Sequence, residues 1–338
     1  MDKLNIAILG ATGAVGREML KTIAARVPEA DGVRLFASAR SAGERMSFRS
    51  GTLTVEEIRD DSFDGMDFVL GAVEAEVSRR MAERVRASGA VYIDNSSAFR
   101  LCPDVPLVVP EINGEDALGH RGIIANPNCS TVIAMMAAAP ISRLSPLKSV
   151  IACTYQAVSG AGLGGLRELE RQTADIAAGR EPECGVFPAQ IAMNVIPHIG
   201  ETLDDLYTDE EMKMQNEGRR LLHLPELKVN CTCVRVPVMR SHSIALTVRT
   251  ERPVGVEEAR EAIRAFPGCV LAGDVCGREW PTPLDASGGD LVMVGRIRKD
   301  LCDGNGLSLW CCGDQIRKGA ALNAVQILQY LAKNRQKG

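Results

Sequence analysis

The sequence of 338 residues has only four histidines and no excess of positive charge. The formal net charge is −4, so no broad basic surface is available to hold nucleic acid or an anionic membrane. The longest apolar runs fall far short of the roughly 20 residues that cross a bilayer. We therefore expect neither a nucleic-acid partner nor a membrane segment, and any anionic ligand must be bound by a few placed arginines and lysines.

Leader and metal-binding patterns are also missing. The apolar run at residues 4–9 is short and leads directly into glycines, so it predicts a first strand and not a signal peptide. Eleven cysteines, an odd number, favour reduced thiols in the cytoplasm. No CxxC pair is present, and we expect Cys231 and Cys233, two apart on a predicted strand, to point to opposite faces. With so few histidines, we expect no metal site.

The length favours two domains, and the first part of the chain alternates between short apolar runs and amphipathic stretches. Strands are predicted at 4–9, 33–37, 67–73, 90–95, 107–110 and 122–126, with helices at 14–26 and 75–88. Alternation of this kind predicts an α/β domain of the Rossmann type, with a mostly parallel, doubly wound sheet.

After residue 128 the predicted strands become longer and alternate in polarity. They lie at 149–158, 229–238, 242–250, 291–300 and 307–312, and helices are predicted at 163–178, 209–221 and 255–265. This pattern predicts an α+β catalytic and dimerisation domain with one exposed or subunit-contacting sheet face. The tail, residues 314–334, is a predicted helix that returns to the first domain. We place the cofactor-binding domain at 1–127 with 318–338, and the catalytic domain at 128–317.

Three glycines, Gly10, Gly13 and Gly16, lie between the first predicted strand and the first helix, in ILGATGAVGREML. Glycines allow a tight turn and close approach of a phosphate, and a helix N-terminus offers free amides to it. The pattern predicts a dinucleotide site, although an ordinary strand–helix turn is the alternative.

The end of the second strand favours NADP over NAD. An NAD site usually has an acid there for the ribose hydroxyls, whereas this sequence has Arg40 and Ser41 and no acid before Glu44. A cation with neighbouring hydroxyls suits a 2′-phosphate. The alternative is that Arg40 is only a solvated turn residue.

Cys129 follows Pro127 at the predicted start of a helix, in GIIANPNCSTVIAMM. A thiol at a helix N-terminus is stabilised as the thiolate, and the same amides can stabilise an oxyanion on a carbonyl that the sulfur attacks. Most cysteines are simply small buried apolar residues, but this position distinguishes Cys129 from the other ten. It predicts a nucleophile.

A thiol nucleophile needs a base, and four histidines are available. His120 lies in a predicted loop, His198 follows a proline, and His223 lies at a helix end. His242 opens a predicted strand just after VRVPVMRS, where it could serve a polar cleft. A structural histidine remains the alternative for His242.

Together these segments resemble the aspartate-β-semialdehyde dehydrogenase family over nearly the whole chain. NPNCST combined with RVPVMRSHS is a specific signal, much stronger than the glycine loop. The other matching segments are GATGAVGREML, SSAFR, TYQAVSGAG, FPAQIAMNVIPHIGE, YTDEEMKMQNE, VGRIRKD and LWCCGDQIRKGAALNAVQI.

The resemblance implies a role for particular residues. The catalytic set is Cys129 as nucleophile, His242 as general acid/base and Gln156 as a substrate-positioning group. The substrate-binding set is Arg235 for a carboxylate, Glu210 for an amino group, and Lys213, Arg100 and Asn128 for phosphate. The cofactor-binding set is Gly10, Thr12, Gly13, Ala14, Val15, Arg40, Ser41, Ser159, Gly160 and Asn323.

The implied reaction is the NADPH-dependent reductive dephosphorylation of β-aspartyl phosphate through a thioester on Cys129. It belongs to the aspartate-family pathway to lysine, methionine, threonine and diaminopimelate, and family members are homodimers or homotetramers. Inorganic phosphate is the second product, and no metal takes part. The chemistry agrees with the residue types, because arginine suits a carboxylate and glutamate suits an ammonium. Without the resemblance, Glu210 and Lys213 would be a surface ion pair and Arg235 a rim charge.

The sequence departs from the family pattern in two places. The segment 68–78, FVLGAVEAEVS, differs from the expected small-residue loop, and Gln315 stands where the family usually has asparagine. Two rival interpretations remain. The related N-acetyl-γ-glutamyl phosphate reductases share the chemistry but typically have glycine in place of Asn128. A catalytically dead paralogue that serves in binding or assembly is expected to have lost Cys129 or His242.

Overall fold

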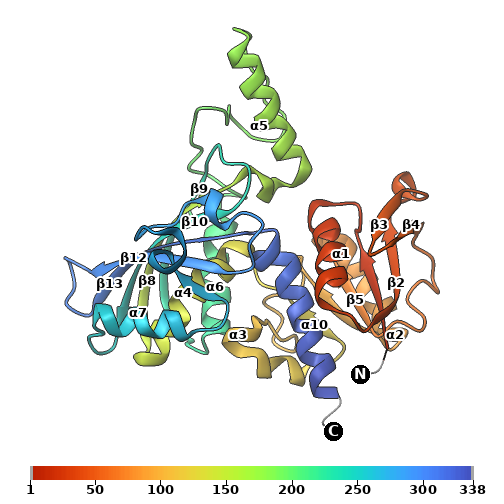
Figure 1. Ribbon diagram of the computed structural model, residues 1–338, viewed down its shortest axis with the longest axis horizontal. Coiled ribbons are helices and arrows are strands. Elements are labelled where there is room, and N and C mark those ends of the chain that lie inside the picture. Colours follow the sequence, from red (N-terminus) through yellow and green to blue (C-terminus); the bar gives the residue numbers. More distant parts are fainter. Residues whose placement is uncertain (1–2, 336–338) are drawn as a thin grey trace. The chain divides into compact units, whose positions relative to one another are not determined.

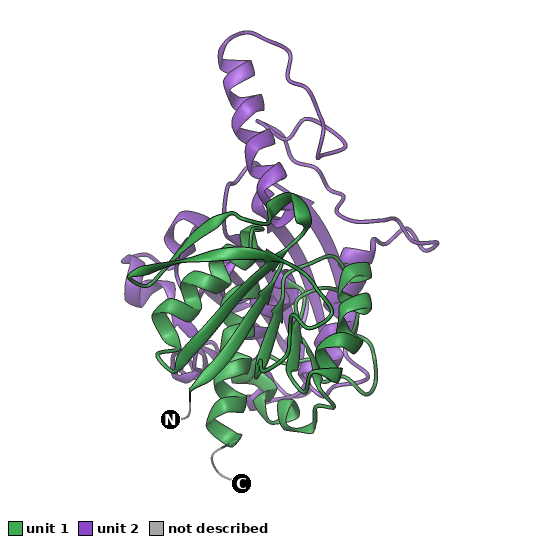
Figure 2. Cartoon of the chain, turned by 90° about the vertical axis from the view of Figure 1, so that its right-hand side faces the viewer, with its two compact units in different colours: residues 1–128, 320–338 green, residues 129–319 purple. Residues whose placement is uncertain are grey.

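The computed structural model describes residues 3–335. Contacts divide the chain into two compact units, residues 1–128 with 320–338 and residues 129–319, which Figure 2 distinguishes by colour. The C-terminal segment thus belongs to the same unit as the N-terminal one.

The first unit is built on a seven-stranded sheet. Its strands are β1 (Leu4–Leu9), β2 (Ala30–Ala37), β3 (Arg45–Phe48), β4 (Gly51–Glu57), β5 (Phe68–Gly71), β6 (Val91–Asp94) and β7 (Ile123–Ala125). Their order is β3-β4-β2-β1-β5-β6-β7, and every pairing is parallel except β3 with β4. The predicted doubly wound, mostly parallel sheet is confirmed.

The strands at the centre of this sheet are buried on both faces. Ile6 and Ile8 of β1 share one apolar core with Leu328 of the C-terminal helix. The helices of the unit are α1 (Ala14–Arg26), α2 (Ala75–Ala87), the short α3 (Pro110–Asn113) and α10 (Leu322–Arg335). Helix α1 buries Met19 and Ile23 and contacts α10. Burial of each such side chain contributes about 1.5–3 kcal/mol, which explains why the tail joins this unit.

Two features of this unit differ from the predictions. The strand predicted at 107–110 is wrong: Leu107 forms an isolated bridge with Ala125, and Pro110 starts α3. Proline is suited to the first position of a helix, where its missing N–H needs no partner. The β3–β4 hairpin was not predicted, because its strands are mostly polar and half exposed.

The second unit contains a six-stranded mixed sheet. Its strands are β8 (Leu147–Gln156), β9 (Lys228–Arg235), β10 (His242–Thr250), β11 (Cys269–Leu271), β12 (Val292–Lys299) and β13 (Gly306–Gly313). Their order is β11-β12-β13-β10-β8-β9, so β10 lies between β13 and β8, antiparallel to both. The predicted α+β organisation is confirmed.

Several helices contact this sheet. The longer ones are α4 (Cys129–Leu144), α6 (Asp209–Leu221) and α7 (Val256–Ala265), and two short ones are α8 (Ala272–Cys276) and α9 (Pro283–Ala286). Residues 130–141 of α4 are all buried. Side chains such as Ile151 and Tyr155 of β8 are exposed instead, and Tyr155 contacts Trp310 with 5.3 Å between ring centroids. Helix α5 (Gly162–Ala177) and the chain after it stand away from the sheet (Figure 1).

The expectation that Cys231 and Cys233 point to opposite faces was wrong. Side chains alternate along a strand, so residues two apart share a face. Both thiols are buried, and their sulfur atoms lie 3.7 Å apart. Within residues 3–335, no group of three or more histidine, cysteine or acidic side chains is arranged to hold a metal ion. No helix in that range is long and apolar enough to span a bilayer.

Candidate active site

The centre of the site is a cysteine at a helix start and a histidine at a strand start. Cys129 is the first residue of α4, and His242 is the first residue of β10. The Cys129 Sγ lies 3.4 Å from the His242 Nε2. A sulfur at a helix N-terminus, in contact with an imidazole, is the arrangement that favours a nucleophilic thiolate.

A backbone hydrogen bond holds the His242 ring at the nitrogen that does not face Cys129. The Ala157 N–H donates a hydrogen bond to His242 Nδ1 over 3.0 Å. The side chain is almost fully buried, and burial, together with the positive charge of Arg235, lowers the pKa of His242 well below its ordinary value. The imidazole is therefore neutral at pH 7, and its Nδ1 serves as an acceptor.

Arg235, the last residue of β9, places a buried cation beside this pair. Its Nη1 donates to the Ala157 carbonyl over 2.8 Å. Burial lowers the pKa of Arg235, while the neighbouring Cys129 and Glu210 act in the opposite direction. The guanidinium borders a cavity of about 380 Å³ whose walls include Phe187, and it lies 5.9 Å from that ring. A cation at the edge of a largely apolar cavity is suited to a small anion.

A second charged group lies at the end of β8. Gln156, the last residue of β8, donates from Nε2 to Glu210 Oε1 over 3.1 Å. The other oxygen of Glu210 accepts from Lys213 Nζ at 3.0 Å. Burial lowers the pKa of Lys213, but the charges of and hydrogen bonds to Glu210 and Asp209 outweigh it and leave that pKa raised. Because the Glu210 side chain is only 11% exposed, this is not a solvated surface pair.

Two glycines leave room for these side chains. A Cβ atom at Gly160 would lie 2.8 Å from Arg235 Nη1 and 3.4 Å from His242 Cε1. A Cβ atom at Gly319 would lie 2.8 Å from the Cβ of Cys129. Gly160 was predicted for the cofactor site, and here it also packs against one catalytic candidate, His242, and one substrate-binding candidate, Arg235. Gly319 lies in a π-helical turn, Arg317–Ala321, a distortion that is frequent at functional sites.

The glycine loop of the first unit is packed tightly against neighbouring backbone. Gly10 has a φ of +85°, and a Cβ atom there would lie 2.3 Å from the Ala72 carbonyl oxygen. A Cβ atom at Gly16 would lie 2.3 Å from the Gly10 carbonyl oxygen. Gly13 caps α1, and Ala14 and Val15 form its first turn. The divergent segment 68–78 thus lies directly against this loop.

The end of β2 lies beside the same loop. Thr12 Oγ1 is 3.5 Å from Ser41 Oγ. Arg40 is exposed in the turn Ala39–Ser41. The first acid along the chain after β2 is Glu44, and it forms an ion pair with Arg17. The structure therefore brings together Thr12 and Ser41, which were predicted to share a cofactor site.

Three further predicted residues lie in the first unit. Arg100 is buried and donates to the carbonyls of Asn126, over 3.0 Å, and Asn95, over 2.7 Å. Asn128 is also buried. Asn323 is fully buried, and its Nδ2 donates to the Val108 carbonyl and to Asn126 Oδ1. These bonds give Asn323 a structural role, and contact with a cofactor stays a prediction for it.

Sequence reasoning missed three contributors to this site. The Ala157 amide carries no side-chain signal, and Phe187 is one of several apolar residues in its segment. Gly319 lies in the segment RKGAA, which predicts a helix. Nothing in that segment indicates that Gly319 approaches Cys129. Ala157 and Phe187 emerge only when the sheet order places β8, β9 and β10 side by side. Gly319 emerges only when the turn after β13 lies against the start of α4.

Comparison with known proteins gives consistent matches. Residues 5–120 match the family model described as semialdehyde dehydrogenase, NAD binding domain, and residues 139–318 match semialdehyde dehydrogenase, dimerisation domain. The chain is 46% identical to the aspartate-semialdehyde dehydrogenase of Synechocystis sp. over 98% of both chains. It is 44% identical to that of Bacillus subtilis, again over 98% of both. It is also similar to the crystal structure of aspartate semialdehyde dehydrogenase II from Vibrio cholerae complexed with ASA, with a TM-score of 0.95, 40% identity and coverage of 98% and 99%.

Proposed function

Because the chain belongs to the aspartate-semialdehyde dehydrogenase family, we propose that it reduces β-aspartyl phosphate to aspartate-β-semialdehyde with NADPH and releases inorganic phosphate. The observation that carries the proposal is the 3.4 Å contact between Cys129 Sγ and His242 Nε2 beside the buried cation of Arg235. This reaction supplies the aspartate-family amino acids.

Cys129 forms the covalent intermediate. Its sulfur attacks the carbonyl carbon of the acyl phosphate, the new C–S bond forms, and the C–O bond to phosphate breaks. Phosphate leaves with that electron pair and takes up a proton. Amides at the start of α4 stabilise both the thiolate and the oxyanion that develops on the carbonyl.

His242 manages the proton of the thiol. Since Nδ1 accepts from the Ala157 N–H, the neutral ring holds its own proton on Nε2, facing the sulfur. In the resting arrangement the Nε2 proton of His242 therefore faces the Cys129 sulfur. His242 acts as the base for a protonated thiol only after the ring releases Ala157 and moves its proton to Nδ1.

Hydride transfer completes the reduction. When bound, NADPH supplies a hydride to the thioester carbonyl carbon. The α4 amides hold the resulting thiohemiacetal oxyanion, which collapses, breaks the C–S bond and returns Cys129 as the thiolate.

Charged side chains orient the substrate. Arg235 binds the substrate carboxylate at the edge of its cavity, and Glu210, steadied by Gln156, accepts the substrate ammonium. Lys213, Arg100 and Asn128 bind the phosphate. Arginine gives a carboxylate two parallel hydrogen bonds, which fix its orientation as well as its position.

The first unit fits a dinucleotide on structural grounds. The absence of side chains at Gly10 and Gly16 allows the close backbone packing of the loop that leads into α1. The free amides at the start of that helix would bind a pyrophosphate. Thr12, Ser41 and Arg40 would hold the adenosine ribose and its 2′-phosphate, while Ser159 and Gly160 would serve the nicotinamide end. Absence of an acid before Glu44 favours NADP.

The proposal extends to assembly and location. The segment matched by the dimerisation-domain model, with the exposed face of the six-stranded sheet, supports a homodimer or homotetramer. A cytoplasmic location stays a prediction that rests on the eleven unbridged cysteines.

The test is the reverse reaction followed at 340 nm with aspartate-β-semialdehyde, NADP and inorganic phosphate. Activity that depends on phosphate is the expected result. N-Acetylglutamate semialdehyde is run in parallel, and activity on that substrate alone would assign the chain to the rival reductases, which the curated relatives do not favour. A folded protein that is silent with both substrates would contradict the proposal.

A further inference from the structure

The 183–200 segment, all of it described by the structure, forms neither a helix nor a strand, yet it supplies most of the wall of the cavity beside Arg235. Most of its residues are exposed, whereas Phe187, Ile191 and Ile196 are buried. A chain without a helix or ladder of its own keeps its place only when other groups bond to it. The position of this segment therefore depends on contacts with its surroundings.

The segment contacts Arg235 in two ways. The Ile196 N–H donates to the Arg235 carbonyl over 2.9 Å, and the Arg235 N–H donates to the Ile196 carbonyl over 2.8 Å. The Phe187 ring lies 5.9 Å from the Arg235 guanidinium, within the range in which a cation is attracted to an aromatic face. The same stretch of chain thus contacts both the backbone and the charged group of this arginine.

A buried carboxylate of α5 holds the part of the segment that carries Phe187. Glu168 is only 5% exposed, and its Oε2 accepts the N–H groups of Gly185, over 3.2 Å, and of Val186. Its Oε1 accepts the Phe187 N–H over 3.3 Å and the Nε2 of Gln172 over 3.2 Å. Hydrogen bonds to an ionised acceptor are stronger than those between neutral groups, and three successive amides surround this one.

Gln172, one turn further along α5, holds a second point of the segment. Its Oε1 accepts the N–H groups of Ile191, over 2.9 Å, and Ala192, over 3.1 Å. Its Nε2 also donates to the Glu183 carbonyl over 3.0 Å. The Gln172 side chain is fully buried, so water does not compete for these bonds. Two neighbouring side chains of one helix therefore fix the segment on either side of Phe187.

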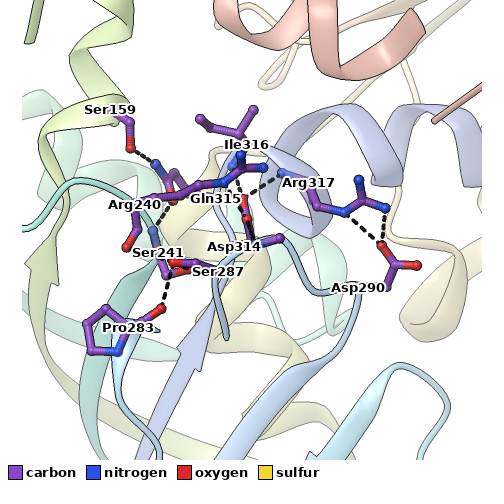
Figure 3. A network of polar contacts seen from close by, with 11 residues as sticks. Ser159, Arg240, Ser241, Pro283, Ser287, Asp290, Asp314, Gln315, Ile316 and Arg317 are labelled. Atoms are coloured by element: carbon purple, nitrogen blue, oxygen red, sulfur yellow. Dashed lines mark hydrogen bonds and ion pairs between the residues drawn. The ribbon is translucent and has the colours of Figure 1, made fainter. Parts of the chain in front are cut away.

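Helix α5 is itself attached to the sheet at its start. The hydroxyl of Ser159, in the loop before the helix, accepts from Gln315 Nε2, and Gln315 Oε1 accepts the Ser241 N–H over 2.8 Å, as Figure 3 shows. Val158 of the same loop belongs to one apolar cluster with Leu169 of α5. The helix can therefore serve as a fixed support for the 183–200 segment.

We propose that Glu168 is a positioning residue for Arg235, because it holds residues 185–187 so that the Phe187 ring stays against the guanidinium. With the ring on one side and the Ala157 carbonyl as its acceptor, the guanidinium has little freedom to turn. The inference rests on the proposed function, in which Arg235 binds the substrate carboxylate, and deepens it. Glu168 would thus set the affinity for that carboxylate without touching the substrate.

The variant that tests this proposal is Glu168→Gln. It keeps the shape of the side chain but replaces one acceptor oxygen with a donor NH₂ group. In either orientation, two of the four N–H groups that meet Glu168 lose their acceptor. Glu170→Gln, the same substitution at an exposed position of the same helix, is the matched control.

Steady-state kinetics provide the first readout. If the guanidinium shifts, the substrate carboxylate loses one of its two hydrogen bonds, so we expect the KM for aspartate-β-semialdehyde to rise roughly tenfold. The change in kcat and in the KM for NADP should stay below about threefold, because neither depends on that carboxylate contact alone. Glu170→Gln should have the kinetic constants of the wild type.

The second readout needs neither cofactor nor substrate. Cys129 is alkylated with anionic iodoacetate and, separately, with neutral iodoacetamide, and both rates are followed by mass spectrometry of the Cys129 peptide. Both reagents react with the same thiolate, so the ratio of the two rates is independent of the thiolate fraction. It reports the positive charge beside the sulfur, which Arg235 supplies.

Exposed Cys302 gives a reference ratio in the same digest. Relative to this reference, Glu168→Gln should lower the iodoacetate to iodoacetamide ratio at Cys129 roughly threefold to fivefold, the size of a screened contact between two unit charges. Arg235→Ala sets the scale for complete loss of the charge, and Glu170→Gln should leave the ratio unchanged.

A Glu168→Gln protein with the wild-type KM for the semialdehyde, or with an unchanged alkylation ratio, would overturn the inference. If Glu168→Gln does not fold, Phe187→Leu takes its place, since it keeps an apolar side chain and removes the ring beside Arg235. An unchanged ratio in Phe187→Leu would overturn the inference equally. If the wild type turned over neither semialdehyde, the proposed function would fail, while the alkylation ratio would still report the placement of Arg235.

Discussion

The two units present their functional groups in different ways. The first offers mainly backbone: the absence of side chains at Gly10 and Gly16 lets the loop pack against the Ala72 and Gly10 carbonyls and form the tight turn into α1. The second offers mainly side chains at strand ends: Gln156 and Arg235 are the last residues of β8 and β9, and His242 is the first of β10. The site in the first unit therefore depends on positions without a side chain, whereas the site in the second unit depends on particular side chains.

This difference determines how each site fails. A backbone cradle is lost when an atom is added, since overpacking displaces the loop. A side-chain site is lost when an atom is removed or shifted, since the reacting groups must lie within hydrogen-bond distance. Substitutions that add or remove atoms therefore separate the two units functionally.

Cys129→Ala is expected to have the largest effect. Without the sulfur no thioester forms, so turnover should fall by on the order of 10⁴-fold or more. Rapid-quench and steady-state rates with aspartate-β-semialdehyde measure the loss, and thermal unfolding checks the fold. Cys302→Ala, an exposed cysteine, is the control and should retain full activity. Appreciable turnover by Cys129→Ala would exclude covalent catalysis.

Gly319→Ala tests whether the side-chain site tolerates an added atom. The new Cβ would lie 2.8 Å from the Cβ of Cys129, so the nucleophile must move. We expect kcat to fall by roughly 10²-fold, with NADP binding retained. Gly304→Ala, where nothing lies within 4 Å of the added atom, is the matched control in the same unit. Equal kcat values for the two variants would show that Gly319 has no role beside the nucleophile.

Gly16→Ala is the corresponding change in the backbone cradle. Its Cβ would lie 2.3 Å from the Gly10 carbonyl oxygen and would displace the loop. Since overpacking costs about 1–3 kcal/mol, the KM for NADP should rise roughly tenfold or more. Cys129 alkylation without cofactor should be unchanged, because Gly16 and Cys129 lie in different units. Gly119→Ala, which has open space around the added atom, serves as the control.

Arg40→Ala refines the comparison within the first unit, because it removes one of the few side chains offered there. The preference for NADP over NAD should fall roughly tenfold, mainly through the KM for NADP, as the contact of one exposed cation with the 2′-phosphate is lost. Arg45→Ala, another exposed arginine in this unit, should leave the ratio of kcat/KM values unaltered. An unchanged ratio in Arg40→Ala would remove the basis for assigning Arg40 to the 2′-phosphate.

The smallest effect concerns stability and pH. Burial lowers the pKa of His242 well below the unfolded value of about 6.5. Below pH 6.5 the unfolded chain binds a proton at His242 that the folded chain does not. The free energy of unfolding therefore falls with pH from about 6.5 down to the lowered pKa, by up to about 1.4 kcal/mol per pH unit. Above pH 6.5 the residue contributes no pH dependence.

Urea unfolding of the wild type and His242→Gln at pH 7.0 and 5.5 checks this prediction. The substituted protein should lose less stability between the two pH values. Identical losses would mean that His242 is accessible to protons in the folded enzyme.

Much of the fold was predictable because its elements have strong local signals. Helices at 14–26 and 209–221 and the strand at 242–250 begin and end where the sequence indicates. The strand predicted at 107–110 failed because a short apolar run does not distinguish a strand from a buried turn that ends in proline. The β3–β4 hairpin was missed because it has little apolar surface to mark it.

The site was predictable only where a residue type and its position both carry chemistry. Cys129 was identified by its helix start, whereas His242 depended on the family resemblance. Three features could not be predicted from the sequence. They are the acceptor role of the His242 Nδ1, the approach of Gly319 to Cys129 and the two hydrogen bonds of Gln315. They depend on which strands are neighbours, and sequence spacing alone does not determine sheet order.

Side chains along β8 alternate between the exposed face of the sheet and the face that carries the candidate active site. Tyr155 is exposed beside Trp310, and the next residue, Gln156, is buried and bonded to Glu210. Adjacent residues of a strand share a stiff peptide plane, so a force applied to one is transmitted to the other. A surface that packs against Tyr155 and Trp310 would therefore restrict the motion of the backbone segment that carries Gln156. In this way a contact on the outer face of the sheet would influence the site on the inner face.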